Sequence, residues 1–283
     1  MAVMTCPKCR ARPKTHGKFW IKKGRYIPKH DHQPVQRYKC KLCGTNFSAR
    51  TFSPIYRQHK PWLNEPLRKA LASSVTFRRS AVIFGVARNT VVAKFIWIAQ
   101  RSRREHLKML AHREDKVRSV EFDEMETYQA SRLNMLSISM AVDSATGDIL
   151  HAKVARMRPK GRLAQKYPNA WQRWNVDNRR QASEAVLKRV ASLADPNVTV
   201  SCDGKRAYSP LIKAQLPNAR LQAVPRFAKN GHVLSKFNHV AAKIRADLAR
   251  MRRRTWACTR KWQNLQHHLY LYIGWNNRYN LAV

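Results

Sequence analysis

The chain has 283 residues, of which 44% are hydrophobic, so a wholly disordered chain is excluded and the length favours two domains over one. Lys and Arg number 56 against 16 Asp and Glu, which gives a formal net charge of +40. Because such a surplus repels itself on a compact body, it favours a polyanionic partner, and nucleic acid is the leading one.

The sequence carries no run of about 18 apolar residues and no N-terminal leader, so we expect no membrane partner and a location in the cytoplasm. Four of the six cysteines form two Cys-x-x-Cys pairs within the first 43 residues. This usage differs from a secreted disulfide framework and predicts a reducing compartment.

The first motif along the chain pairs Cys6 and Cys9 with Cys40 and Cys43. Two such pairs present four thiolates to one tetrahedral ion, and Zn²⁺ is the usual occupant. A pair of redox dithiols is the alternative interpretation. A module of about 50 residues rarely buries enough surface to fold alone, so metal binding would stabilise it. We therefore predict a structural zinc site in a zinc ribbon spanning residues 1–55.

The next segment is predicted to be a helix-turn-helix domain over residues 56–112. Ser80 to Val92 has the pattern of a short helix, a turn with Gly85 and a second helix. The N-terminal residues of such a second helix face DNA. The candidate DNA-binding residues are Arg88, Asn89, Thr90 and Lys94. An ordinary helical hairpin with a solvated polar face is the alternative.

From residue 117 the hydrophobic period changes to that of strands. The predicted elements, in chain order, are strands at 117–127, 136–142 and 149–154, a helix at 181–194, a strand at 198–202 and a helix at 235–251. Strands mixed with helices predict an α/β class, α+β at the domain level, for a domain over residues 113–283.

Two aspartates are candidate metal ligands in this domain. Asp123 lies in the first predicted strand and Asp203 at the end of the fourth. Two carboxylates from adjacent strands would hold hard divalent cations such as Mg²⁺, and a phosphodiester is the natural substrate of so basic a protein. The alternative is that Asp203 belongs to a plain turn and Asp123 to an exposed acidic strand.

Three segments together resemble bacterial insertion-sequence transposases with an RNase H-like catalytic core. These segments are Phe122 to Thr127, Ser201 to Tyr208, and Phe237 to His239 with Arg252 to Lys261. The resemblance covers almost the whole chain, including the zinc ribbon and the helix-turn-helix. It implies Mg²⁺- or Mn²⁺-dependent cutting at transposon ends and strand transfer into target DNA. It also implies homo-oligomers on paired ends and a location at the bacterial nucleoid.

The family usually has a third acid about 35 residues after the second Asp, where this chain has Asn238. The resemblance therefore implies Asp123, Asp203 and Asn238 as the catalytic, magnesium-binding set. An amide offers a neutral ligand, so cation affinity should fall unless a neighbouring acid compensates. Asp247 is the alternative third ligand, on the opposite border of the helix's apolar stripe. Arg245, on the side of Asn238, is predicted to contact DNA phosphate.

Two functions from different classes follow. The first is an active transposase. The second is a transposase-derived DNA-binding regulator that has lost its chemistry through Asn238. A ribonuclease or other nuclease with the same core is a third reading.

Overall fold

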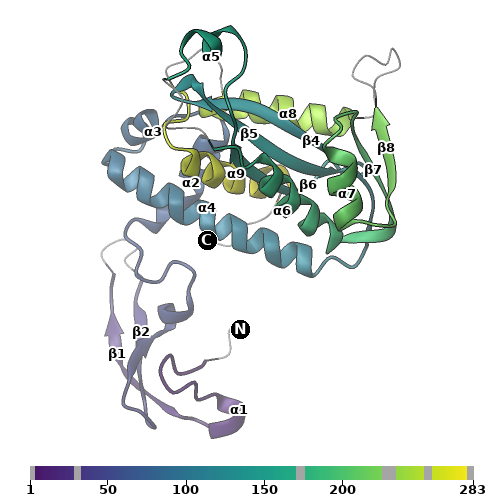
Figure 1. The fold of residues 1–283 in the computed structure, drawn as a ribbon. Helices are drawn as coiled ribbons and strands as arrows, with labels where there is room; N and C mark the ends of the chain where they lie inside the picture. Colours follow the sequence, from purple (N-terminus) through teal and green to yellow (C-terminus); the bar gives the residue numbers. More distant parts are fainter. Residues whose placement is uncertain (1–3, 29–32, 170–175, 225–233, 252–256, 279–283) are drawn as a thin grey trace. The chain divides into compact units, whose positions relative to one another are not determined.

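The computed structural model describes residues 4–28, 33–169, 176–224, 234–251 and 257–278 (Figure 1). The chain forms two compact units, one built from residues 1–66 and the other from residues 67–281. The predicted border at residue 112 lies inside the second unit. A division of that unit into residues 56–112 and 113–283 stays a prediction.

The first unit is built around a three-stranded antiparallel sheet. Its elements are α1 (Pro13–His16), β1 (Trp20–Tyr26), β2 (Val35–Cys40), β3 (Asn46–Ser48), η1 (Ala49–Phe52) and η2 (Pro61–Leu63), and α2 (Asn64–Ala72) crosses the boundary between the units. Its small core contains Phe19 and Phe47 together with Cys6 and Cys40, all of them buried. With so few apolar side chains, the cysteine cluster forms a large part of this core.

The second unit alternates strands and helices after an initial pair of helices. Its elements are α3 (Phe77–Ile83), α4 (Arg88–Ala111), β4 (Val117–Gln129), β5 (Ser131–Asp143), β6 (Ile149–Arg156), α5 (Arg162–Lys166), α6 (Arg179–Ala191), β7 (Ala194–Asp203), α7 (Tyr208–Gln215), β8 (Arg220–Val224), α8 (Ser235–Asp247), η4 (Ala249–Met251) and α9 (Trp262–Asn276). The six elements predicted over residues 117–251 are all present, and α5, α7 and β8 are additional within that span.

The strands form one five-stranded sheet in the order β6-β5-β4-β7-β8. Neighbours β6, β5 and β4 pair antiparallel as the predicted meander, whereas β4, β7 and β8 pair parallel. The predicted fold class, an RNase H-like mixed sheet flanked by helices, is confirmed. The central position of β4 brings it beside β7, although 64 residues separate the two strands in the chain.

The two faces of β4 carry different groups because side chains alternate along a strand. Phe122 faces a buried cluster that includes Val186 of α6 and Tyr208 of α7. Glu121 and Asp123 point to the other face, where Figure 1 shows α8 running along the sheet, and α8 packs on β4 and β5. The sheet thus separates Glu121 and Asp123 from the apolar core beneath α6 and α7, whereas Glu124 lies on the side of α6.

Helices α3 and α4 meet at a bend of 111°, within the range for a helix-turn-helix. Gly85 in the turn has φ +58°, a left-handed conformation that glycine adopts without a steric cost. Thr76 accepts a hydrogen bond from the Arg79 N–H and so begins α3. Among the described residues no single helix is long and apolar enough to cross a membrane; α3 and α4 pass that test only when taken together across their bend.

Candidate functional site

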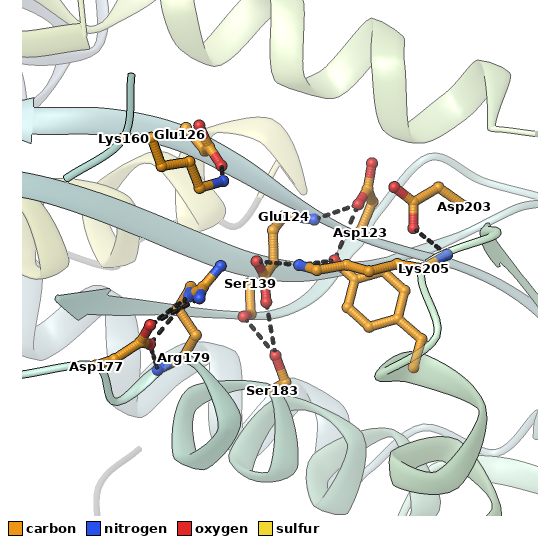
Figure 2. A network of polar contacts seen from close by, with 11 residues as sticks. Asp123, Glu124, Glu126, Ser139, Lys160, Asp177, Arg179, Ser183, Asp203 and Lys205 are labelled. Atoms are coloured by element: carbon orange, nitrogen blue, oxygen red, sulfur yellow. Dashed lines mark hydrogen bonds and ion pairs between the residues drawn. The ribbon is translucent and has the colours of Figure 1, made fainter. Parts of the chain in front are cut away.

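The structure brings Asp123 and Asp203 side by side. Phe122 of β4 pairs in parallel register with Cys202 of β7, so the residues that follow each of them are neighbours at the same level of the sheet. Figure 2 shows the two carboxyl groups facing each other. Residues 80 positions apart in the chain therefore share one site.

Asp123 is held by hydrogen bonds to one of its two oxygens. Oδ1 accepts the backbone N–H of Glu124 at 2.7 Å and the Tyr208 hydroxyl at 3.1 Å (Figure 2). Burial raises the pKa of Asp123 to about 6, with a further upward contribution from the negative charge of Asp203. A cation placed between the two carboxylates would oppose both effects.

One oxygen of each aspartate is left for a ligand. Asp203 Oδ1 accepts the backbone N–H of Lys205 at 3.2 Å. Within the part of the chain that the structure describes, Oδ2 of Asp123 and Oδ2 of Asp203 accept no hydrogen bond. Carboxylate oxygens that accept no other hydrogen bond are the hard, anionic ligands that Mg²⁺ and Mn²⁺ prefer, so these residues fit a divalent cation.

Asn238 lies in the first turn of α8, on the helix that covers the Asp123 face of β4. Glu121, two residues before Asp123, is buried and accepts the backbone N–H of Phe237 at 2.6 Å. This bond fixes the start of α8 on that face and leaves Asn238 exposed. Among the described residues Asn238 makes no hydrogen bond to either aspartate.

The alternative third ligand, Asp247, is engaged elsewhere. Its Oδ2 accepts the hydroxyl of Tyr272 of α9 at 2.8 Å, at the far end of α8 from Asn238. Arg245 lies half-buried on the same helix. Of the third segment that carries the resemblance, residues 252–256 lie outside the described residues.

A second network lies behind the aspartates. The sequence marks Glu124 as a nearby electrostatic or structural group but does not predict its contacts. The Lys205 Nζ donates to Glu124 Oε2 at 2.8 Å, and the Ser183 hydroxyl donates to Glu124 Oε1 at 3.2 Å (Figure 2). The Glu124 side chain is only 7% exposed, whereas that of Lys205 is 36% exposed, so the carboxylate of this ion pair is shielded from solvent and the ammonium group is partly accessible. Lys205 thereby ties β4 to the turn after β7. Its place two residues after Asp203 was the signal available in the sequence.

A cavity of about 460 Å³ opens beside this network. Its lining includes Glu124, Arg179, Ser183, Lys205, Tyr208 and Leu211. Arg179 forms an ion pair with Asp177 at 2.7 Å at its rim (Figure 2). The cavity therefore combines apolar walls with charges of both signs next to the aspartates.

The four cysteines of the first unit converge as the sequence predicts. All four sulfurs lie within 4.8 Å of one another, with Cys6 and Cys43 at 3.5 Å and Cys9 and Cys40 at 3.7 Å. Sulfurs at the corners of a tetrahedron about 2.3 Å from a zinc ion would be about 3.8 Å apart. The sulfur positions therefore fit a tetrahedral zinc ion.

Each cysteine pair sits in the same tight turn. The Arg10 N–H donates to the Cys6 carbonyl at 3.1 Å, and the Gly44 N–H donates to the Cys40 carbonyl at 3.0 Å. Arg10 and Gly44, each the residue after a second cysteine, have positive φ of 61° and 71°. Hydrogen bonds with the side chain and backbone of Thr45 lower the pKa of Cys43 to about 6, which favours the thiolate form that binds zinc.

The predicted DNA-contacting residues of α4 divide into two groups. Arg88 and Asn89 are exposed at its start, and Thr90 is half-buried. Lys94, in contrast, is buried at 7% exposure, and this desolvation lowers its pKa to about 8. The expectation that Lys94 faces DNA is corrected, because the side of α4 that carries Lys94 also carries the buried Val91 and packs inward.

Comparison with solved structures finds the Mos1 mariner transposase. The catalytic domain has 10% identity over 65% of this chain and 89% of that chain, with a TM-score of 0.26. The same domain with Raltegravir and Mg is 10% identical, with a match that covers 65% of this chain and 83% of that chain and a TM-score of 0.29. The Mos1 Strand Transfer Complex is 11% identical, with a match that covers 78% of this chain and 76% of that chain and a TM-score of 0.25. Values this low carry no argument about function. No protein-family model and no curated protein sequence matches this chain.

Proposed function

We propose that this protein is a DNA transposase, which cuts DNA at the ends of an insertion sequence and transfers the strand to target DNA in a metal-dependent reaction. The single observation that carries the proposal is the pairing of Asp123 and Asp203 on adjacent parallel strands, each with one oxygen free of hydrogen bonds among the described residues. The resemblance of the segments around both residues to insertion-sequence transposases supports it.

Asp123, Asp203 and Asn238 would hold Mg²⁺ or Mn²⁺ in this site. When bound, the cations activate an attacking oxygen and stabilise the leaving oxygen of a phosphodiester. The residues around the site position these ligands. The Tyr208 hydroxyl and the Glu124 N–H orient Asp123, and Glu121 holds the start of α8 by its bond to Phe237. The net charge of +40 attracts the DNA backbone.

The remaining parts of the proposal concern DNA recognition and assembly. The zinc-bound first unit, a zinc ribbon, and the α3–α4 pair, a helix-turn-helix with Arg88, Asn89 and Thr90 toward DNA, would bind the transposon ends. Arg245 would contact phosphate from α8. Homo-oligomers would assemble on paired ends in the bacterial cytoplasm, at the nucleoid.

The regulator remains a second candidate because Asn238 stands where the family has an acid. Incubation of the protein with DNA that carries the sequences flanking its gene, with Mg²⁺ or Mn²⁺, distinguishes the two. A transposase yields strand breaks at the inverted repeats, whereas a regulator binds the same DNA without cutting it. Cutting of an RNA–DNA hybrid in preference to DNA would favour the nuclease reading instead.

Substitutions of Asn238 should change the metal requirement in opposite directions. Asn238→Asp adds a charged oxygen and should lower the Mg²⁺ concentration that gives half-maximal cleavage, whereas Asn238→Ala should raise it. The measurement is the cleavage rate as a function of Mg²⁺ concentration. Asn218→Asp, which adds the same charge at an exposed position between α7 and β8, serves as the control and should leave the requirement unchanged. Equal requirements in all four proteins would remove Asn238 from the ligand set.

Stabilisation of the protein by Mg²⁺ should depend on pH. Burial raises the pKa of Asp123 from about 3.8 in the unfolded chain to about 6 in the folded protein. Between pH 3.8 and pH 6 the folded protein therefore binds a proton that the unfolded chain does not bind. The stability of the metal-free protein falls as the pH rises through that window. Ionised Asp123 is the form that binds the cation. We expect Mg²⁺ to raise the melting temperature more at pH 7 than at pH 5. Asp123→Asn should abolish the difference; its persistence in that variant would place the metal elsewhere.

A further inference from the structure

A pocket on the second unit concentrates positive charge away from the aspartates. Its volume is about 380 Å³, and α3, α4, η4 and α9 all contribute to its lining. The basic residues that line it are Arg78, Arg88, Arg250, Arg260 and Lys261, and none of its described lining residues is an Asp or Glu. A concave surface with five basic side chains and no carboxylate attracts an anion.

Arg250 lines the pocket from η4 and is half-buried. Its guanidinium lies 5.2 Å from the centre of the Phe77 ring and 5.8 Å from that of Phe95, and its Nε donates to His268 Nδ1 at 2.7 Å. Among the described residues no carboxylate pairs with it. A partly buried charge without a counter-charge is stabilised when an anion binds to it, so this guanidinium favours an anionic ligand in the pocket.

His268 is a neutral ring, so it neither supplies the anion nor adds a second positive charge to the pocket. Its Nε2 lies 2.9 Å from the Leu71 carbonyl and carries the proton, while Nδ1 accepts from Arg250. Burial, with the nearby charge of Arg250, lowers the pKa of His268 to about 3, so the ring is neutral. The neutral ring orients the guanidinium and leaves its charge intact. The remaining guanidinium N–H groups are available to the pocket.

The outer residues make the pocket accessible to a large ligand. Arg88, Arg260 and Lys261 are exposed, and among the described residues none of the three forms an ion pair. Arg88 is the first residue of α4, and Lys261 is the N-cap of α9, so the N-terminal ends of two long helices add their partial positive charges at this pocket.

We propose that this pocket binds a backbone phosphate of DNA and so anchors the strand at the junction of α4 and α9. Planar guanidinium groups match the paired oxygens of a phosphate, and Arg88 and Arg260 line the pocket in addition to Arg250. Arg88 at the entrance joins the pocket to the surface of α4 that is proposed to face DNA. The inference rests on DNA binding in the proposed function and is independent of cleavage.

The test measures DNA affinity of the full chain without Mg²⁺, so that cleavage plays no part. Fluorescence anisotropy with a 5′-labelled duplex of arbitrary sequence gives the dissociation constant between 100 and 400 mM NaCl, a range of about fourfold that resolves the salt slope. Arg260→Ala and Lys261→Ala each remove an exposed pocket cation and leave Arg250 in place. Arg104→Ala is the control. It removes an exposed arginine of α4 that lies outside the pocket.

We expect each pocket variant to weaken binding and to reduce the slope of log K against log salt by about 0.9, the value for one lost phosphate contact. Arg104→Ala should match the unmodified protein. An equal reduction by all three variants would show diffuse attraction by net charge and would overturn the proposal. Stabilisation by inorganic tripolyphosphate that the pocket variants lose, with no change in their DNA binding, would assign the pocket to a free oligophosphate and would also overturn it.

Arg250 itself gives a further measurement. Arg250→Ala leaves a cavity against Phe77 and Phe95 and is expected to destabilise the fold, so Arg250→Lys is the informative variant. It keeps the charge but loses the forked donors. We expect it to retain the far-ultraviolet circular dichroism of the unmodified protein and to bind DNA more weakly. Unchanged DNA affinity in a folded Arg250→Lys protein would exclude the guanidinium from phosphate binding.

Discussion

Asp123→Ala and Asp203→Ala are each expected to lower DNA cleavage by about 10³-fold or more. Metal-ion catalysis contributes several kcal/mol to transition-state stabilisation, and each 1.36 kcal/mol corresponds to about a tenfold change in rate. Either substitution removes a carboxylate whose Oδ2 is free for the cation among the described residues. The measurement is single-turnover cleavage of a labelled DNA end, with DNA affinity measured in parallel.

DNA affinity should stay close to that of the unmodified protein, because neither aspartate bears the positive charge that attracts DNA. Asp115→Ala, which removes an exposed carboxylate from the loop before β4, is the matched control and should cut normally. If cleavage and DNA affinity fell together in the Asp123 and Asp203 variants, the aspartates would be structural. Normal cleavage by either variant would contradict the proposed site.

The sequence predicted the site strands well because their pattern is strong. The meander at β4, β5 and β6 consists of long alternating strands, and the helix at 235–251 carries an apolar stripe that is indeed buried in α8, through Phe237, Val240 and Ile244. In contrast, β8 is only five residues long. Leu221 and Gln222 within it are not buried, so β8 lacks the alternation by which a strand is recognised.

The details of the site depend on contacts between distant residues, which periodicity does not reveal. Strand alternation places Glu124 away from Asp123, but it does not show that Lys205, 81 residues later, pairs with it. The burial of Lys94 likewise depends on contacts between distant residues. Spacing places it on the second helix of a helix-turn-helix, whereas the packing of α4 against α9 decides which of its sides is covered. The pocket around Arg250 likewise joins residues from four elements.

Cys40→Ser is expected to remove the bound zinc and unfold the first unit. Cys40 is fully buried, and its sulfur lies 3.7 Å from that of Cys9 in the four-sulfur cluster. Structural zinc contributes about 10–16 kcal/mol of apparent binding free energy in small modules, which is comparable to the whole stability of a domain. The readouts are zinc content per chain by mass spectrometry and the rate of proteolysis within residues 1–66.

The second unit has its own core, so its resistance to protease and its melting transition should survive in the Cys40→Ser protein. Cys258→Ser makes the same chemical change outside the cluster and should retain one zinc ion per chain. Unchanged zinc content in Cys40→Ser would exclude the four-cysteine site. Loss of zinc with undiminished protease resistance of residues 1–66 would show that the apolar groups around Phe19 and Phe47 suffice to fold this unit, and the metal would then have a role other than stability.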